Sequence, residues 1–368
     1  MMDKAIGLYV NNAGPCPCQR TRQQPFPPSK ARRLLRVPGS GYHQEDAILI
    51  RPLLCTFEIT RFFLLRFSVF LQQLLNGLTL GSVYALIALG YTMVYGILEL
   101  INFAHGEIYM LGAYLSIILL GFFTAIGLTS YSLALSLALT LVLTIIFCSS
   151  YGFTIEKIAY RPLRNAPRLS PLISAIGVSI FLQNYVMLTQ GATDKVFPSH
   201  FWGAGFTFLS TRMTYLQAMI ILVSGCMMIM LHTFIRKTKT GKAMRAVAQD
   251  KVMASLLGVN IDNIIGITFI IGSGLAAVAG MMVAMYYGLV NYFIGYSAGI
   301  KAFTAAVLGG IGSVPGAMLG GILLGLIESL GASYISSEYK DAYAFIILII
   351  ILLVKPEGLL GKNLEEKI

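Results

Sequence analysis

The feature that most limits the fold of this chain is a series of long stretches without a single charged residue. Seven such runs follow one another, at 67–98, 108–155, 169–193, 213–235, 263–300, 302–327 and 342–354. A helix needs about 20 apolar residues to cross the hydrocarbon core of a bilayer. Most of the runs reach this length, and the second is long enough to cross twice with a turn near 127–131. These runs predict a protein that crosses a membrane several times.

Composition favours helical spans over strands. Hydrophobic residues make up 56% of the chain and charged residues 12%, whereas soluble proteins carry about 25% charged residues. A membrane barrel would show short segments of alternating hydrophobicity, and the long runs rich in leucine, alanine and methionine lack that pattern. We therefore predict an all-α membrane protein with about eight transmembrane helices, including interrupted or half helices.

Basic residues predict the side of the membrane on which each loop lies. The formal net charge is +11, but lysine and arginine gather in loops beside the runs, as the positive-inside rule describes, and they indicate no nucleic-acid partner. On this rule the loops at 152–168 and 236–245 are cytoplasmic, and the loop at 194–212 is external. The part before residue 128 crosses two or three times. Three passes are needed if the arginines near its start hold the N-terminus inside.

Residues 1–66 differ from the rest of the chain. They contain more than half of the 13 prolines and many basic residues, and they show no sustained helical period. A segment of this kind buries too little apolar surface to fold alone. We predict a basic, proline-rich extension that is disordered or belongs to a start site assigned too early, with a surface-binding or regulatory tail as the alternative. Residues 67–368 then form one membrane domain.

The longest polar insertion in the apolar body lies at 236–258. Thr240 and Gly241 can begin a helix there and Gly258 can end it, so that a rod of about 22 Å would cover 243–257. The residues that would share one stripe of this rod are Ala243, Ala246, Val247, Ala254 and Leu257. By themselves these residues leave two interpretations open, a basic helix among lipid headgroups or a docking rod for another protein.

Glycines interrupt the apolar runs in two places, as they do in transporters that contain half-helices. We expect one interruption between Gly96 and Gly106 and a second at a Gly-Pro turn late in the chain. The residues assigned to these hinges are Gly96, Gly106, Gly309, Gly310, Gly312, Pro315 and Gly316.

Polar residues inside the runs are candidates for a translocation pathway. They are Asn76, Tyr84, Asn102, His105, Glu107 and Glu328. Ionisable groups at membrane depth mark pathways, although at a helix end the same groups are more often interfacial. His105 and Glu107 are two residues apart and point to different sides of a helix, which does not favour a metal or proton-relay pair.

The sequence contains no motif for catalysis or metal binding. A Walker motif, an HExxH motif, a nucleophile elbow and a histidine pair at metal spacing are all missing from it. We therefore predict a transport protein without a catalytic residue, a metal or a cofactor of its own. Its energy comes from an ion gradient or from a separate protein.

Several stretches together resemble one family. Among them are INFAHGEIYMLGAY (101–114), GKAMRAVAQDKVMASLLGVN (241–260) and KAFTAAVLGGIGSVPGAMLGG (301–321), with others at 74–97, 155–164 and 172–185. From about residue 70 onward the chain is similar to the LivH-type permease subunits of bacterial branched-chain amino acid ABC importers. The resemblance implies a permease for leucine, isoleucine and valine in the bacterial inner (plasma) membrane.

The resemblance also implies partners and a coupling segment at 236–260. A second homologous permease, two ATP-binding subunits that hold ATP and magnesium, and an external substrate-binding protein are expected. A cytoplasmic helix would dock on an ATP-binding subunit, and the residues that match it are Gly241, Arg245, Ala246, Asp250, Ala254, Leu257 and Gly258. The alternatives are a permease for urea, amides or other amino acids, a gradient-driven transporter, and a membrane-embedded enzyme.

Overall fold

The computed structural model describes residues 46–361 apart from 101, 165, 168, 199–204 and 209–210, and it describes side chains from Arg66 onward. The chain divides into two units, and the second, Leu64–Ile368, carries the candidate membrane spans. Most of the predicted extension at 1–66 lies outside the described residues, so the proposal about its nature stays a prediction.

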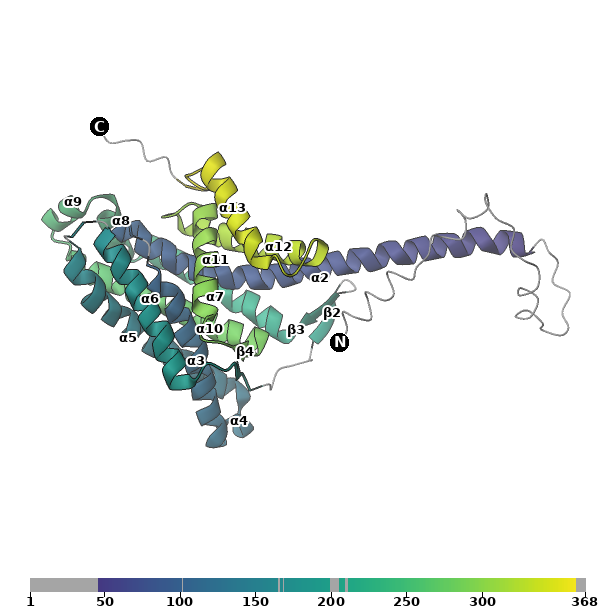
Figure 1. Cartoon of the computed structure of the whole chain (residues 1–368), viewed down its shortest axis with the longest axis horizontal. Helices are drawn as coiled ribbons and strands as arrows, with labels where there is room; N and C mark the ends of the chain where they lie inside the picture. Colours follow the sequence, from purple (N-terminus) through teal and green to yellow (C-terminus); the bar gives the residue numbers. More distant parts are fainter. Residues whose placement is uncertain are drawn as a thin grey trace. The chain divides into compact units, whose positions relative to one another are not determined.

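Seven helices in the described part of the chain are long and apolar enough to cross a membrane. They are α2 (Asp46–Leu98, with its apolar part from Arg66), α3 (Ala104–Ala125), α5 (Leu133–Ile155), α6 (Leu169–Gln190), α7 (Tyr215–Lys237), α10 (Ile261–Tyr287) and α12 (Val314–Tyr334) (Figure 1). Two shorter apolar helices, α11 (Ile294–Gly309) and α13 (Lys340–Val354), complete the bundle. The all-α membrane fold predicted from the sequence is confirmed.

Helices α2 and α10 form the centre of the bundle. Most residues in their spans are buried, whereas only a minority of those in α5, α6 and α7 are buried. Small residues let α2 and α12 approach closely, because a Cβ atom at Gly325 would lie 2.3 Å from the Cα of Gly81. Close backbone contact of this kind stabilises helix pairs in a bilayer, where no hydrophobic effect drives them together.

The long second run folds into two helices, as predicted. Helix α3 ends at Ala125, Gly127 takes a left-handed conformation with φ 82°, and the short helix α4 (Leu128–Tyr131) leads to α5. Before residue 128 the described chain has two spans, α2 and α3. The described residues therefore favour two passes over three.

A second predicted interruption separates α11 from α12. Gly310 and Gly312 have φ values of 104° and 90°, which glycine adopts without strain, and the Ser313 side chain caps α12 at the Gly316 N–H. The last carbonyls of α11 are also bonded, since the Leu359 and Leu360 N–H groups donate to the Leu308 and Gly309 oxygens at 2.9 and 3.0 Å. The interruption expected at the Gly-Pro turn is present, but α12 is long enough to cross a membrane by itself, so the expectation of two half-helices is not met.

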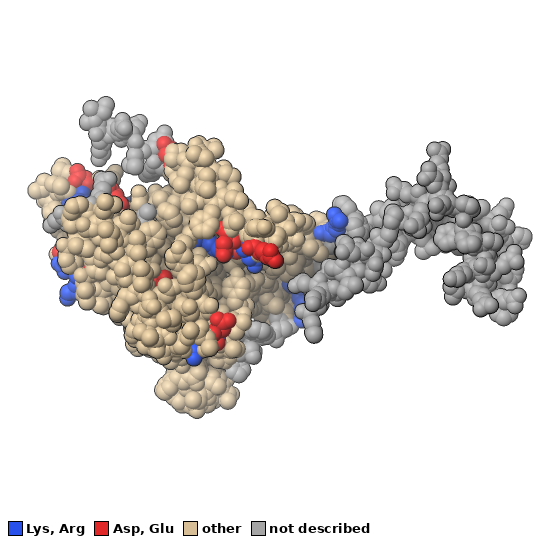
Figure 2. All heavy atoms as spheres, viewed as in Figure 1, with Lys and Arg blue, Asp and Glu red and all other residues tan. Residues whose placement is uncertain are grey.

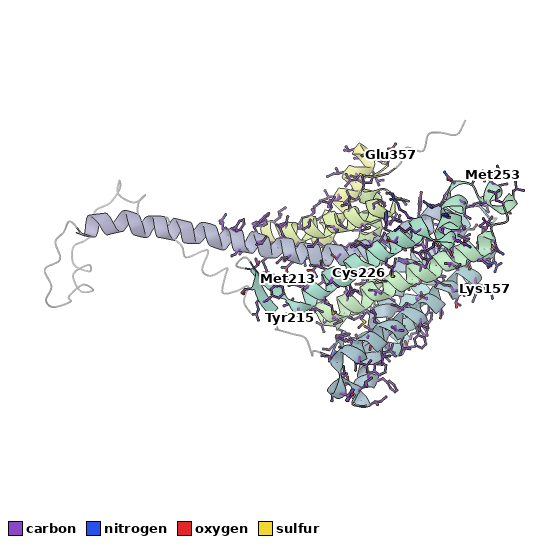
Figure 3. All side chains as sticks on the ribbon, turned by 180° about the vertical axis from the view of Figure 1, so that it is seen from behind. Lys157, Met213, Tyr215, Cys226, Met253 and Glu357 are labelled. Carbon is purple, nitrogen blue, oxygen red and sulfur yellow. The ribbon has the colours of Figure 1, made fainter. Side chains whose placement is uncertain are left out.

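Short strands lie at one end of the bundle. Strand β1 (Lys195–Val196) pairs with β4 (Leu289–Val290), and β2 (Gly205–Phe208) pairs with β3 (Thr211–Thr214). Met213 and Tyr215 mark this end in Figure 3, while Met253 and Lys157 mark the opposite end. The loop at 194–212 and the end of α10 therefore lie on the same side of the bundle.

Candidate functional site

The polar insertion forms two helices instead of one rod. Helix α8 (Lys239–Gln249) begins after Thr238, and helix α9 (Lys251–Leu256) begins after Asp250. Asp250 has an extended backbone, and its carboxylate accepts hydrogen bonds from the N–H groups of Val252 and Met253 at 2.8 and 3.0 Å. This cap starts a new helix, so the single rod predicted at 243–257 is wrong. Gly258 ends α9 with φ 82°, as predicted.

The stripe of small residues predicted as the docking face turns largely inward. Val247 and Ala254 are buried, and Gly241 packs so closely that a Cβ atom there would lie 2.4 Å from the Ile235 carbonyl oxygen. Ala243 and Ala246 are half-buried. These residues hold α8 and α9 against the body of the same chain, and this corrects their assignment to a partner surface.

Four apolar side chains face outward at α9, and only Leu257 among them belongs to the predicted stripe. Val252, Met253, Leu256 and Leu257 are 58–81% exposed, and Figure 3 shows Met253 at the extremity of the bundle. We call these four residues the α9 patch. Of the predicted coupling residues, Arg245, Asp250, Leu257 and Gly258 are exposed with it. The apolar spacing in VMASLL could have indicated the patch, but the search for small residues missed it.

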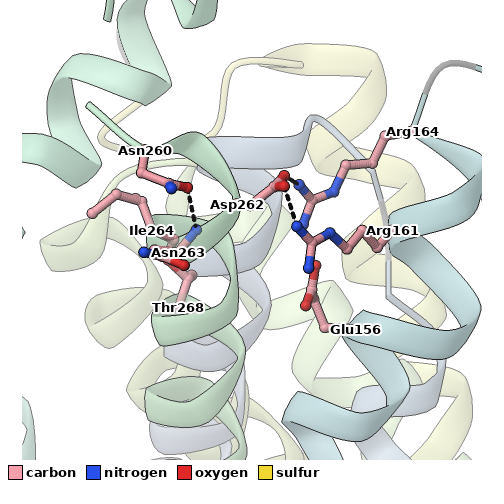
Figure 4. Close-up of polar contacts among 8 residues, drawn as sticks. All are labelled: Glu156, Arg161, Arg164, Asn260, Asp262, Asn263, Ile264 and Thr268. Carbon is pink, nitrogen blue, oxygen red and sulfur yellow. Dashed lines mark hydrogen bonds and ion pairs between the residues drawn. The ribbon is translucent and has the colours of Figure 1, made fainter. Parts of the chain in front are cut away.

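An ion-pair cluster adjoins the start of α10. The Asp262 carboxylate pairs with both Arg161 and Arg164, and Arg164 also pairs with Glu156 (Figure 4). Glu156 lies in the π-helical turn η2 (Glu156–Tyr160), and Arg161 begins the 3-10 turn η3 (Arg161–Leu163). Only three residues separate Asp262 from Gly258, which follows α9, so the cluster joins the end of α5 to the segment that carries the α9 patch.

The same π-helical turn contacts the first interruption. The Tyr160 hydroxyl donates a hydrogen bond of 2.6 Å to the Asn102 side-chain oxygen, and both residues are buried. Helix α2 ends at Leu98, Glu99 has φ 59°, and α3 begins at Ala104. The break therefore lies where it was predicted, between Gly96 and Gly106, but Gly96 belongs to α2 and Gly106 to α3. Gly106 instead packs inside α3 against the Gly295 carbonyl.

Three predicted pathway residues gather at this break. Asn102, His105 and Glu107 are each at most 2% exposed. Glu107 accepts a 3.0 Å hydrogen bond from the Ser179 hydroxyl, and the His105 ring lies 4.9 Å from that of Tyr91. In the described part of the chain, His105 Nε2 and Glu107 Oε2 are buried atoms with no hydrogen-bond partner. Buried polar atoms of this kind require an explanation, because most native ones are paired.

Two other pathway candidates meet elsewhere, around a residue that sequence reasoning missed. The Tyr84 hydroxyl donates to Glu328 Oε2 at 2.9 Å, and Lys301 Nζ donates to Glu328 Oε1 at 2.8 Å. Lys301 also pairs with Asp341 at 2.7 Å. The signal was present, since Lys301 is the one charged residue between 263 and 327.

Asn76 lies apart from both groups. Its side-chain oxygen accepts a 2.9 Å hydrogen bond from Gln217 near the start of α7. Gln72, one turn earlier in α2, accepts from the Arg212 N–H at 3.1 Å. Asn76 therefore belongs to the strand-bearing end of the bundle, and the six pathway candidates occupy three separate places.

Comparisons with known proteins agree with this architecture. A profile of the family described as "Branched-chain amino acid transport system / permease component" matches residues 73–352. The high-affinity branched-chain amino acid transport system permease protein LivH of Salmonella typhimurium is 53% identical over 308 residues, which are 82% of this chain and 99% of that protein. The permease BraD of Pseudomonas aeruginosa is 52% identical over 81% of this chain and 98% of its own length. No solved structure matches the chain.

Proposed function

The chain belongs to the branched-chain amino acid transport system permease family, and from this premise we propose that it is the membrane subunit of an ATP-driven importer of leucine, isoleucine and valine. The observation that carries the proposal is the identity of about half the residues over nearly the whole length of relatives named as high-affinity branched-chain amino acid permeases. The helical bundle with an interrupted centre supports the same role.

The remaining parts of the importer would be separate proteins. We propose a second, homologous permease, two ATP-binding subunits that hold ATP and magnesium, and an external binding protein that delivers the amino acid. The sequence supports this division of labour because it contains no Walker motif with which the chain could bind nucleotide. The membrane would be the bacterial inner membrane.

The proposed orientation follows from charge and contacts together. The basic loop at 236–245 would face the cytoplasm with α8 and α9, and the strand-bearing end would face outward. With two spans before residue 128, the apolar part of α2 then begins on the outer side.

We propose that the α9 patch is the surface on which an ATP-binding subunit docks. Its four exposed apolar residues lie outside the apolar spans. Contiguous exposed apolar residues of this kind mark interaction sites. The α9 patch replaces the small-residue stripe as the expected contact with the ATP-binding subunit. The segment at 236–260 keeps its proposed docking role.

Movement of α9 would reach the interior through contacts described above. Asp262 follows α9 closely and pairs with Arg161 and Arg164. The π-helical turn beside them ends at Tyr160, which bonds Asn102 at the interruption between α2 and α3. Turns of this type occur inside helices at functional sites. We propose that this chain of polar contacts links ATP-driven movement to the gathered Asn102, His105 and Glu107.

Reconstitution tests the proposed function directly. The purified permease pair with its ATP-binding subunits is placed in liposomes, and uptake of radiolabelled leucine is measured with the binding protein present. We expect uptake only when ATP is supplied to the side that carries α9. Uptake by this chain alone, driven by an ion gradient without ATP, would contradict the proposal.

A further inference from the structure

Tyr84, Lys301, Glu328 and Asp341 form a cluster that we call the Lys301 network. One end of this cluster reaches the protein surface. The side chains of Lys301 and Glu328 are 11% and 3% exposed, whereas that of Asp341 is 69% exposed. Tyr84 donates to the same carboxylate of Glu328, and its ring lies 5.9 Å from Lys301 Nζ. Four helices, α2, α11, α12 and α13, thus each contribute one polar side chain.

Lys301 lies near the middle of the apolar helix α11, whereas Asp341 lies in the first turn of α13. Lys301 is about 10 Å from the first residue of α11 and about 12 Å from the last, at 1.5 Å per residue. Uncharged runs flank it on both sides in the sequence. Figure 2 shows acidic and basic side chains gathered over the region of α11 and α12. A charged group in the middle of an apolar membrane helix faces a protein partner or a water-filled path and not lipid.

Packing alone does not require these charges. The α2–α12 contact is already made by glycines, since a Cβ atom at Gly321 would lie 2.4 Å from the backbone of Ala85 and one at Gly325 would lie 2.3 Å from that of Gly81. A buried ion pair is often no better for stability than apolar side chains of similar volume. A role beyond stability therefore accounts better for a lysine held between two carboxylates.

The arrangement matches the charges of a free amino acid. Glu328 holds an ammonium group at 2.8 Å, which is the group that a zwitterionic substrate also carries. Lys301 offers the complementary partner for the substrate carboxylate, and Asp341 can take over Lys301 because it is already bonded to it. Two carboxylates and one lysine leave the cluster with one negative charge in excess, which favours entry of the ammonium end first.

We propose that Lys301 and Glu328 form a transient site for the charged groups of the amino acid on its way through the membrane. This inference rests on the proposed function. The substrate ammonium replaces that of Lys301 at Glu328, and the released Lys301 binds the substrate carboxylate. When the substrate leaves, the original pair forms again and no charge stays unpaired.

Paired replacement of the two residues separates this role from a structural one. The variants are Lys301→Met, Glu328→Leu and the double variant, and Glu338→Gln, an exposed acid outside the network, is the control. Each complex is reconstituted with its partner subunits and binding protein, and both the Tm and the initial rate of leucine uptake are measured. Lys301→Met leaves the buried Glu328 carboxylate without its lysine and lowers the Tm, whereas Glu328→Leu leaves Lys301 paired with Asp341 and lowers it less.

The double variant gives the decisive result. We expect its Tm to lie above that of Lys301→Met, because no buried charge is left unpaired, while leucine uptake stays at least about tenfold below the wild-type rate, because charge-assisted hydrogen bonds to the substrate are lost. Recovery of uptake together with the Tm would show an ordinary structural pair and overturn the inference. Loss of uptake by the wild-type complex itself would instead contradict the proposed function.

A binding measurement keeps the inference testable if a single variant does not assemble. Leucine at millimolar concentration is added to the detergent-purified wild-type and double-variant complexes without the binding protein, and the Tm is followed. We expect leucine to raise the Tm of the wild type, and 4-methylpentanoate, which lacks the ammonium, to raise it less. An equal rise in the double variant would overturn the inference.

Discussion

Tyr160 and Asn102 are 58 residues apart in the sequence, yet the hydroxyl of the first donates a buried 2.6 Å hydrogen bond to the side chain of the second. This contact ties the π-helical turn after α5 to the break between α2 and α3. It is the inner end of the polar route that begins at Asp262. A route of this kind has consequences that substitutions can test one contact at a time.

Removing the Tyr160 hydroxyl should weaken transport more than it weakens the fold. Tyr160→Phe leaves the Asn102 side chain buried without this partner, which lowers the free energy of unfolding by about 1–3 kcal/mol. If the route carries movement, leucine uptake per ATP hydrolysed falls as well. The control is Tyr131→Phe, because Tyr131 is 88% exposed in α4. Unchanged coupling in Tyr160→Phe would remove this contact from the route.

The α9 patch should be needed for assembly with the ATP-binding subunits. Leu257→Asp places a charge among exposed apolar side chains and should abolish co-purification of those subunits while the permease keeps its Tm. Ile335→Asp is a matched control, since Ile335 is 76% exposed beyond α12 and lies outside the proposed interface. Equal retention of the ATP-binding subunits by both variants would exclude the patch as the docking surface.

The two arginines that pair with Asp262 should differ in their effect on stability. Arg161 is 46% exposed, and exposed ion pairs contribute about 0–1 kcal/mol. Arg164 is 16% exposed and also neutralises Glu156, whose side chain is 3% exposed. Arg164→Met therefore leaves a buried carboxylate unpaired and should cost about 3–5 kcal/mol. Thermal unfolding of the two single variants in detergent compares them. A larger loss in Arg161→Met would contradict this ranking.

Two glycine-to-alanine substitutions should show how much stability comes from close helix contacts and how much from helix propensity. Gly325→Ala forces a methyl group against the backbone of Gly81 and should destabilise the bundle by about 1–3 kcal/mol. At Gly121 in α3, no atom of the described chain lies within 4 Å of an added Cβ. Gly121→Ala should be neutral or stabilising by up to about 1 kcal/mol. The Tm of each variant measures the difference, and equal Tm values would argue against close packing of α2 on α12.

The helical spans could be predicted because apolar length and the absence of charge are properties of the sequence itself. The double crossing of the second run and the turn at Gly310–Ser313 followed for the same reason, since glycine and proline mark where a helix ends. The break before α3 was harder to place. It falls at Glu99, a non-glycine residue with φ 59°, while the glycines that suggested it serve in packing.

The site was less predictable because its residues are assembled by tertiary contacts. Helix propensity could not show that Asp250 would cap a second helix, since the run from Lys239 onward is made of good helix formers. The spacing of residues in the sequence also could not predict that Tyr84, Lys301 and Glu328, which lie in three different helices, contact one another. Tyr160 was missed because nothing in the local sequence separates a hydrogen-bonded tyrosine from a lipid-facing one.

The C-terminal segment sets an order of events in biosynthesis. The carbonyls of Leu308 and Gly309 at the end of α11 accept hydrogen bonds from Leu359 and Leu360, which the ribosome adds much later. Until then the end of α11 has unsatisfied carbonyls, and the helix that carries Lys301 is incomplete. A premature stop before residue 359 would therefore leave an unfinished bundle for membrane proteases, and an affinity tag belongs after residue 361 and not before it.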